Sequence, residues 1–360
     1  MLFAFNQIIE KNYEMKKTDK KIVILCHDAF NYIKNKTGNM LIRYCTDEVL
    51  AIIDKSKAGK TAESELGYGG DIPVVESFDL CKSIKPDTLV IGNASQGGFI
   101  SDLYRKEVVT AIRFGCDIIS GMHQFLGDDV ELSELANQYG VTLTDLRRSP
   151  QPPNFSKGSW QTRKIPVLLI VGTDCDTGKM TTGWEITERL KKQGRKVEFI
   201  GTGQTGILLS GGGVPIDAVR ADFMAGEIEH VIDQCADETE LIVVEGQGAL
   251  TNQYYAGVTL GLLHGAMPDF MVMTHDPGRE DDVTDLPMVS MDLVMQLHID
   301  LLRNFKDSKF IAINLLTFKL SEEDAKAEIS KIENEYGIAT ADLVRFGDSN
   351  LIDAIERELI

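Results

Sequence analysis

Short runs of apolar residues alternate with helical patterns along the whole chain. In the first half, two segments with helical periodicity, at 101–114 and 130–139, lie among continuously apolar runs. These runs predict strands at Ile22–Leu25, Val49–Ile53, Pro73–Val75, Thr88–Ile91 and Asp117–Ile119. Strands that are apolar without alternation have both faces covered, which is typical of a parallel sheet between two layers of helices.

The second half of the chain repeats this alternation. Six more strands are predicted, at Val167–Val171, Val197–Ile200, Leu241–Val244, Phe270–Met273, Phe310–Ile313 and Leu343–Phe346. Helices are predicted at 181–193, 218–235, 289–305, 321–336 and 348–359. Ser321 followed by Asp324 is typical of a helix start. The pattern therefore predicts a second doubly wound parallel sheet.

The periodicity breaks off at about 148–164. Three prolines and several polar residues follow two consecutive arginines there, which is typical of a linker. We therefore predict a first domain at 1–150, a linker at 151–164 and a second domain at 165–360.

Size and charge limit the classes of function. The chain has 360 residues, enough for two domains, and its 43% of hydrophobic residues supports full cores. The net charge of −18 argues against nucleic acid or an acidic membrane surface as a partner. An anionic ligand must therefore be attracted by local features, and we expect a small-molecule substrate.

The six cysteines are scattered without any C-x-x-C pair. This distribution is typical of reduced, mostly buried thiols and argues against a disulfide framework or a metal site. The opening residues lack the basic start and the cleavage site of a signal peptide, and no apolar run approaches the length of a membrane span. We therefore expect a cytoplasmic protein with no bound metal.

The most informative stretch lies between the strand at Val167–Val171 and the helix at 181–193. A strand, a glycine-containing loop with a lysine, and a helix form the layout of a phosphate-binding P-loop. Backbone amides and the positive end of the helix dipole attract an anion there, and Lys179 adds a positive charge. The predicted phosphate-binding residues are Gly172, Thr173, Asp174, Cys175, Asp176, Thr177, Gly178, Lys179, Met180 and Thr181.

This loop departs from a Walker A motif in two ways. Five residues, in place of four, separate Gly172 from the pair Gly178-Lys179. Met180 stands where a Walker A motif has the hydroxyl that binds Mg²⁺. The loop itself leaves open whether it holds a nucleotide polyphosphate or the diphosphate of coenzyme A. For Cys175 we expect a small buried side chain in preference to a nucleophile.

Two further loops follow predicted strands and should face the same edge of the sheet. In the glycine-rich loop after Val197–Ile200, Gly203, Gln204 and Thr205 are predicted to contact the same anion, with a flexible turn as the alternative. Glu245 ends the strand at Leu241–Val244, as an acid does in a Walker B motif. It is a candidate to orient water or a metal or to act as a general base, and an ordinary strand-end carboxylate is the alternative.

Three other side chains are candidates for substrate binding or proton transfer. They are His264, in the segment 254–265, and His275 and Arg279, which follow the strand at Phe270–Met273. A single histidine in a loop is more often structural, but His275 is the stronger candidate because it lies at the carboxyl end of a strand.

The first half of the chain offers fewer candidate site residues. Its GKT triplet, Gly59-Lys60-Thr61, is a weak phosphate signal, and no G-x-G-x-x-G follows the first strand.

Motifs over nearly the whole chain resemble those of a known family. The GTD and GK residues of the P-loop and the sequence VEGQG resemble the dethiobiotin synthetase branch of P-loop proteins. The fuller set resembles the DgcN-type family, whose members join a Rossmann-like N-terminal domain to a P-loop domain. The matching segments are KTGNMLIRY (36–44), DKSKAGKT (54–61), GNASQGG (92–98), SGMHQFLGDD (120–129), GTDCDTGKMTT (172–182), GTGQTGI (201–207), VRADFMAGEIE (219–229), VEGQGAL (244–250) and GVTLGLLHGAMPD (257–269).

The resemblance implies an α/β protein with a Rossmann-like N-terminal domain followed by a P-loop NTPase-like, doubly wound domain. It also implies an activity, because the family includes D-glutamate N-acetyltransferases, which move an acetyl group from acetyl-CoA to the amine of the amino acid. On this interpretation the P-loop holds the phosphates of CoA. Met180 then fits, because no Mg²⁺ needs to be bound.

Acetyl transfer to an amine requires a base, because an ammonium group cannot attack a thioester. Glu245 is the first candidate for this base, and Asp222 and His275 are its rivals. Arg279, Arg220 and His264 are the candidates for binding the substrate, although Arg220 is equally interpreted as a solvated helix residue.

Two other functions stay open from the sequence. One is an ATP- and Mg²⁺-dependent ligase or kinase like dethiobiotin synthetase, and the other is a nucleotide sensor without catalysis. Release of ADP would identify the first, and release of a thiol from acetyl-CoA would identify a transferase. The sequence does not fix the oligomeric state, so a homo-oligomer also stays open.

Overall fold

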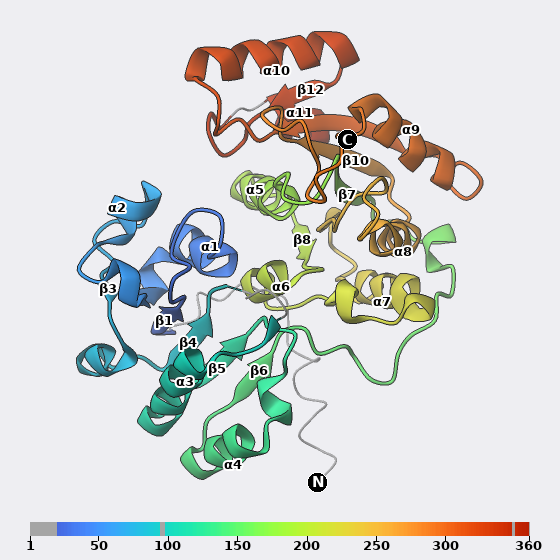
Figure 1. Cartoon of the computed structure of the whole chain (residues 1–360). Coiled ribbons are helices and arrows are strands. Elements are labelled where there is room, and N and C mark those ends of the chain that lie inside the picture. The colour runs from blue at the N-terminus through green and yellow to red at the C-terminus, as the bar shows by residue number, and fades with distance from the viewer. Residues whose placement is uncertain (1–19, 94–97, 348–349, 360) are drawn as a thin grey trace. The chain divides into compact units, whose positions relative to one another are not determined.

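The computed structural model describes residues 20–93, 98–347 and 350–359. The chain forms two compact units, Met1–Arg148 and Ser149–Ile360, and each contains one parallel six-stranded sheet (Figure 1). The predicted class, two α/β domains with parallel sheets, is confirmed. Residues 94–97 of the motif GNASQGG and the opening segment that was considered as a signal peptide lie outside the described residues.

The sheet of the first unit has the strand order β3-β2-β1-β4-β5-β6. The chain leaves β1 towards β2 and β3 and then returns to the other side of β1, which produces a doubly wound sheet. Its strands are β1 (Ile22–Leu25), β2 (Val49–Ile53), β3 (Val74–Val75), β4 (Thr88–Ile91), β5 (Asp117–Ser120) and β6 (Leu143–Asp145).

Polar caps and glycines set the ends of the first unit's two predicted helices. Ser101 accepts a hydrogen bond from the amide of Tyr104 at the start of α3, and Asp129 does the same for Leu132 in α4. Gly115 and Gly140, both in the left-handed conformation, end these helices. The helices of this unit are α1 (Lys36–Tyr44), α2 (Ala62–Leu66), α3 (Asp102–Phe114) and α4 (Val130–Tyr139).

The sheet of the second unit has the strand order β12-β11-β10-β7-β9-β8. Strand β7 lies in the middle, with all six of its residues buried, so the loop that follows it is held by neighbours on both sides. The strands are β7 (Val167–Gly172), β8 (Val197–Ile200), β9 (Leu241–Val244), β10 (Phe270–His275), β11 (Lys309–Leu315) and β12 (Ala339–Ala341).

Seven helices lie among the described residues of the second unit. They are α5 (Lys179–Lys192), α6 (Gln204–Ser210), α7 (Ala221–Ile232), α8 (Ala256–Ala266), α9 (Met291–Leu302), α10 (Glu322–Tyr336) and α11 (Asn350–Arg357). Helix α5 contacts α11, while α7 packs on α8 (Figure 1). The crossover from β7 to β8 through α5 runs in the opposite direction to the crossovers from β8 to β9 through α7 and from β9 to β10 through α8. Right-handed crossovers therefore place α5 on one face of the sheet and the pair α7 and α8 on the other.

Two glycines of α8 allow it to approach α7 closely. A Cβ atom at Gly261 would lie 2.9 Å from Cβ of Met224, and one at Gly265 would lie 2.6 Å from the carbonyl oxygen of Ala225. Larger residues at these positions would therefore push the two helices apart. Most of the segment 257–269, which was matched to the family, therefore belongs to a helix that packs against α7.

The structure differs from the sequence-based prediction at several elements. The strand predicted at Leu343–Phe346 is wrong, because these residues form a turn and the edge strand is β12. The buried carboxylate of Asp342 explains the turn, since it accepts hydrogen bonds from the amides of Thr317 and Arg345. Helices α1, α6 and α8 were not predicted, because their glycines weaken the helical pattern.

The segment predicted as a linker packs within the second unit. The carboxylate of Glu227 accepts hydrogen bonds from the amide and the side chain of Asn154, at 2.7 and 3.1 Å. Glu229 accepts hydrogen bonds from the amides of Lys157, Gly158 and Ser159. The segment is therefore anchored to α7, and the structure divides the chain between Arg148 and Ser149.

The GKT triplet of the first half, Gly59-Lys60-Thr61, is the start of a helix. Thr61 of the GKT triplet caps α2, and the ammonium group of Lys60 is ion-paired with Glu65, so this triplet begins a helix. None of the helices in the described part of the chain has the length and apolar character needed to cross a membrane.

Candidate functional site

The P-loop lies between β7 and α5, at the carboxyl edge of the sheet. Asp176 (φ 58°) and Gly178 (φ 90°) take left-handed backbone conformations, which turn the loop towards the helix. Among the described residues, no acceptor is found for the backbone amides of Gly178, Lys179 and Met180. Three free amides at the start of a helix form a site for an anion.

Lys179 is the buried cation of this site. Its ammonium group donates a hydrogen bond to the carbonyl oxygen of Asp174 at 2.6 Å, across the mouth of the loop. Burial lowers the pKa of Lys179, and the nearby acidic groups, Glu245 among them, oppose this shift. A phosphate in the loop would therefore receive both amide hydrogen bonds and a close positive charge.

The carboxylate of Asp174 anchors the P-loop to the rest of the second unit. It accepts hydrogen bonds from the side chain of Asn252 at 2.9 Å and from the amide of Val283 at 2.8 Å, and it is ion-paired with Arg279. Arg279 also donates a hydrogen bond to the carbonyl oxygen of Cys175 at 2.8 Å. Asp174 thus faces the protein, and the loop is preorganised by segments far apart in the sequence.

Glu245 lies beside this loop, directly after β9. One of its carboxylate oxygens accepts hydrogen bonds from the amides of Thr202 at 2.8 Å and Gly203 at 3.1 Å, and Gln247 donates to the other at 3.3 Å. Burial raises the pKa of the Glu245 carboxyl to about 7, although the two amides, Lys179 and Gln247 act in the opposite direction. The group can therefore take up or release a proton near neutral pH.

The glycine-rich loop after β8 is shaped around Glu245. A Cβ atom at Gly206 would lie 2.1 Å from a carboxylate oxygen of Glu245, and one at Gly203 would lie 2.7 Å from the side-chain nitrogen Nε2 of Gln247. The anion that the amides of Thr202 and Gly203 bind is therefore the chain's own carboxylate. Gln204 begins α6 and Thr205 is buried in its first turn, so their predicted contact with a cofactor stays a prediction.

His275 lies at the edge of the P-loop. Its Nδ1 atom is 2.9 Å from the hydroxyl of Thr173, and burial lowers its pKa. The following residue, Asp276, is buried and ion-paired with Lys319 at 3.0 Å. His275 therefore contacts the loop through a hydroxyl and is neutral at ordinary pH, so it is available to accept a proton or to orient the loop.

The hydroxyl groups after Lys179 differ in their surroundings. Thr182 is buried, and its oxygen accepts a hydrogen bond from the side chain of Asn314 at 2.9 Å. Met180 and Thr181 are half-buried in the first turn of α5. The position that would hold Mg²⁺ in a Walker A motif thus carries a thioether, and the neighbouring threonine hydroxyl at 182 is engaged within the protein.

Three predicted residues are not brought into this cluster. His264 lies in the last turn of α8, which leads to the start of β10, so it is at the opposite edge of the sheet, against Phe305. Arg220 and Asp222 lie at the start of α7 and are exposed. These two share the carboxyl edge with the P-loop, but among the described residues neither side chain forms a hydrogen bond or an ion pair with it.

Several residues of the site were not found from the sequence. Asn252 and Val283 had no recognisable signal, because each acts through a contact with a distant segment. Asn252 is separated from Asp174 by 78 positions and Val283 by 109. A strand-end position was the signal that could have indicated Asp276, since it follows His275 directly.

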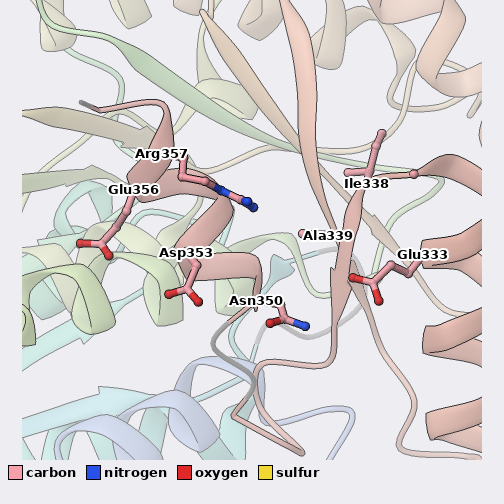
Figure 2. A pocket seen from close by; sticks show the side chains of 8 residues that line it. Glu333, Ile338, Ala339, Asn350, Asp353, Glu356 and Arg357 are labelled. Carbon is pink, nitrogen blue, oxygen red and sulfur yellow. The ribbon is translucent and has the colours of Figure 1, made fainter.

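A surface groove of about 590 Å³ lies elsewhere in this unit, between α10, β12 and α11. In Figure 2, Glu333 projects from one side of the groove and Asp353 from the other. Gly337 and Ala339 place the groove at the amino end of β12. Ligands of open α/β sheets bind at the carboxyl ends of the strands, so this groove is not the candidate site.

The fold and site together define a two-domain protein with a Rossmann-like domain and a P-loop domain. Residues 55–149 match the Rossmann-like domain of unknown function DUF1611_N, and residues 154–352 match the P-loop domain of unknown function DUF1611_C. The chain belongs to the DUF1611 family, and the family resemblance seen in its motifs is confirmed.

Relatives over most of the chain are known. A protein of Tritonibacter scottomollicae named D-glutamate N-acetyltransferase is 37% identical over 80% of this chain and 87% of its own length. A protein of Pseudoalteromonas with the same name is 34% identical over 76% of this chain and 83% of its own length. The crystal structure of a DUF1611 protein from Anabaena variabilis covers 94% of this chain and 99% of its own, with 33% identity and a TM-score of 0.89.

Proposed function

We propose that this protein is an N-acetyltransferase that moves the acetyl group of acetyl-CoA to the amine of D-glutamate or a similar small acidic amino acid. Its similarity to two proteins named D-glutamate N-acetyltransferase supports the reaction and the acceptor. The structural observation that carries the proposal is Glu245, a buried carboxyl group with a pKa of about 7 beside the cradle of Lys179.

The P-loop is the proposed site for the diphosphate of CoA. The free amides of Gly178, Lys179 and Met180 would donate hydrogen bonds to phosphate oxygens, and Lys179 would exchange the carbonyl of Asp174 for a phosphate. No phosphoryl group is transferred in this reaction. The P-loop would therefore only hold the phosphates of the donor, and no phosphate bond would be cleaved. Met180 in place of the usual hydroxyl agrees with that role.

Glu245 is the proposed general base. The ammonium group of the amino acid loses its proton to the carboxylate, and the free amine then attacks the carbonyl carbon of the thioester. A C–N bond forms, the C–S bond breaks, and the electron pair of that bond leaves with the CoA sulfur as a thiolate. The attacking nitrogen loses its second proton as the amide forms, and the thiolate takes up a proton to become the free thiol. A base with a pKa of about 7 is ionised often enough at neutral pH for this task.

Arg220 is the proposed contact for a carboxylate of the acceptor. Arg279 was also a candidate from the sequence, but it is ion-paired with Asp174 and holds the P-loop in place. Arg220 is exposed at the carboxyl edge of the same sheet. An exposed guanidinium at that edge can take a carboxylate without breaking a buried ion pair.

Incubation of the purified protein with acetyl-CoA and D-glutamate, without added Mg²⁺, tests the proposal. We expect one equivalent of free thiol for each N-acetylated product, and no thiol when D-glutamate is left out. Glu245→Gln should lower kcat by about 10²–10⁴-fold, while Asp222→Asn, at an exposed acid of the same edge, should leave it nearly unchanged. Release of ADP from ATP without any thiol release would replace the proposal by the ligase or kinase alternative.

A further inference from the structure

A small, partly enclosed space lies beneath the P-loop. It has a volume of about 10 Å³, which is the space of one water molecule. The carboxyl end of β7 forms one wall, and helices α8 and α9 close the other side. The lining residues that matter for its chemistry are Gly246, Gln247, Gly248, Thr259 and His298.

His298 lines this space and carries an unpaired acceptor. The residue is fully buried on α9, and its Nδ1 atom is 2.7 Å from the carbonyl oxygen of Val294. A carbonyl oxygen only accepts, so Nδ1 carries the proton and Nε2 is a bare acceptor. Burial lowers the pKa of His298 to about 4, which keeps the ring neutral. Among the described residues, Nε2 has no hydrogen-bond partner.

The loop residues that line the same space carry unpaired donors. No acceptor is found in the described parts of the chain for the backbone amides of Gly246, Gln247 and Gly248. The hydroxyl of Thr259 donates to the carbonyl oxygen of Gln247 at 2.7 Å, so its own oxygen can still accept. A buried water needs two to four polar partners, and donors and acceptors of both kinds line this space.

We propose that this space is a binding site for one ordered water, which donates a hydrogen bond to His298 Nε2 and accepts one from an amide of Gly246–Gly248. His298 then acts as a positioning residue for Glu245, because Glu245 leads directly into that loop. Gly246, which follows Glu245, lies directly against β7, since a Cβ atom there would lie 1.7 Å from the carbonyl oxygen of Ile170. The effect on catalysis rests on the proposed function, whereas the water site does not.

A high-resolution crystal structure of the full chain tests the site without any activity measurement. We expect density for one water within hydrogen-bond distance of His298 Nε2 and of a loop amide. A dry cavity would overturn the inference even if acetyl transfer is observed. If the water is present but the protein transfers no acetyl group, the water site is supported and only the proposed function is refuted.

Kinetics test the positioning role. His298→Leu removes the acceptor and should lower kcat about tenfold, or about 1.4 kcal/mol in activation free energy, with an unchanged KM for acetyl-CoA. His298→Gln keeps an acceptor and should recover most of that loss. His264→Leu is the matched control, because His264 also has a buried Nε2 without a partner among the described residues, and it lies at the opposite edge. An unchanged kcat in His298→Leu, or no recovery in His298→Gln, would overturn the role.

Discussion

The guanidinium of Arg279 is ion-paired with the carboxylate of Asp174, and both groups are nearly enclosed by the protein. The Asp174 side chain is 1% exposed and that of Arg279 is 15% exposed. The pair joins the loop after β10 to the P-loop, and the second bond of Arg279, to the carbonyl oxygen of Cys175, fixes the direction of that loop. The anion cradle is therefore formed before any ligand arrives, which lowers the entropic cost of binding.

Breaking this pair should destabilise the second unit. Arg279→Leu leaves the carboxylate of Asp174 buried without its cation, which should lower the free energy of unfolding by about 3 kcal/mol. Urea denaturation followed by tryptophan fluorescence measures this, because both tryptophans, Trp160 and Trp184, lie in the second unit. The double variant with Asp174→Asn should lose less than the sum of the two single variants, and simple additivity would contradict a direct interaction.

The pH dependence of kcat should report the ionisation of Glu245. Its pKa is raised to about 7 by burial, so the active carboxylate form is lost as the pH falls through 7. We expect kcat to rise with pH up to about 8 and to fall about tenfold for each unit well below 7. A profile that stays flat from pH 5.5 to pH 8 would exclude Glu245 as the base.

A single methyl group at Gly206 should displace Glu245. The Cβ atom of Gly206→Ala would lie 2.1 Å from the carboxylate oxygen, so the side chain must move. We expect kcat to fall at least about tenfold. Gly257→Ala, in α8, is the control, since its Cβ atom has open space. This substitution should stabilise the helix by up to about 1 kcal/mol. Equal activity of both variants would contradict the placement of Glu245.

The anchor of the linker segment should depend on pH through Glu229. Burial alone would raise the pKa of this carboxyl, but the hydroxyl of Ser156 and the amides of Ser159, Lys157 and Gly158 lower it to about 2. The folded protein thus resists protonation. The stabilisation is complete above the ordinary pKa of about 4.5 and is lost as the pH falls towards 2.

Glu229→Gln should therefore lower the free energy of unfolding by about 2 kcal/mol at pH 7, because a neutral amide satisfies fewer of these donors. The difference from the wild type should shrink between pH 4.5 and pH 2. Urea denaturation at several pH values, again followed by tryptophan fluorescence, measures it. A difference that is constant over this range would show that the charge of Glu229 does not stabilise the anchor.

Much of the fold was predictable because a strand buried on both faces leaves a continuous apolar run in the sequence. Strands β7 and β9 are examples, and the loop after β7 was predicted from its place between strand and helix. Leu343–Phe346 has a similar apolar content but forms a turn, because the decisive interaction is the buried carboxylate of Asp342 with a residue 25 positions away.

The candidate site was predictable in position more than in detail. The strand-end rule indicated Glu245, but the hydrogen bonds that it accepts from Thr202 and Gly203 depend on the register of β8 and β9, which the sequence does not reveal. The same limit applies to Arg279. It was predicted to bind substrate, yet its pairing with Asp174, across 105 positions, is a tertiary contact without a local signal.

Calorimetric titration with CoA tests most directly whether the P-loop holds the donor. Lys179→Ala should weaken CoA binding about 10- to 100-fold, because it removes the charge that faces the phosphates. Lys60→Ala is the matched control, since Lys60 follows a glycine in the first unit and is ion-paired with Glu65. We predict that Lys60→Ala binds CoA like the wild type. Equal affinity of Lys179→Ala and the wild type would contradict the account.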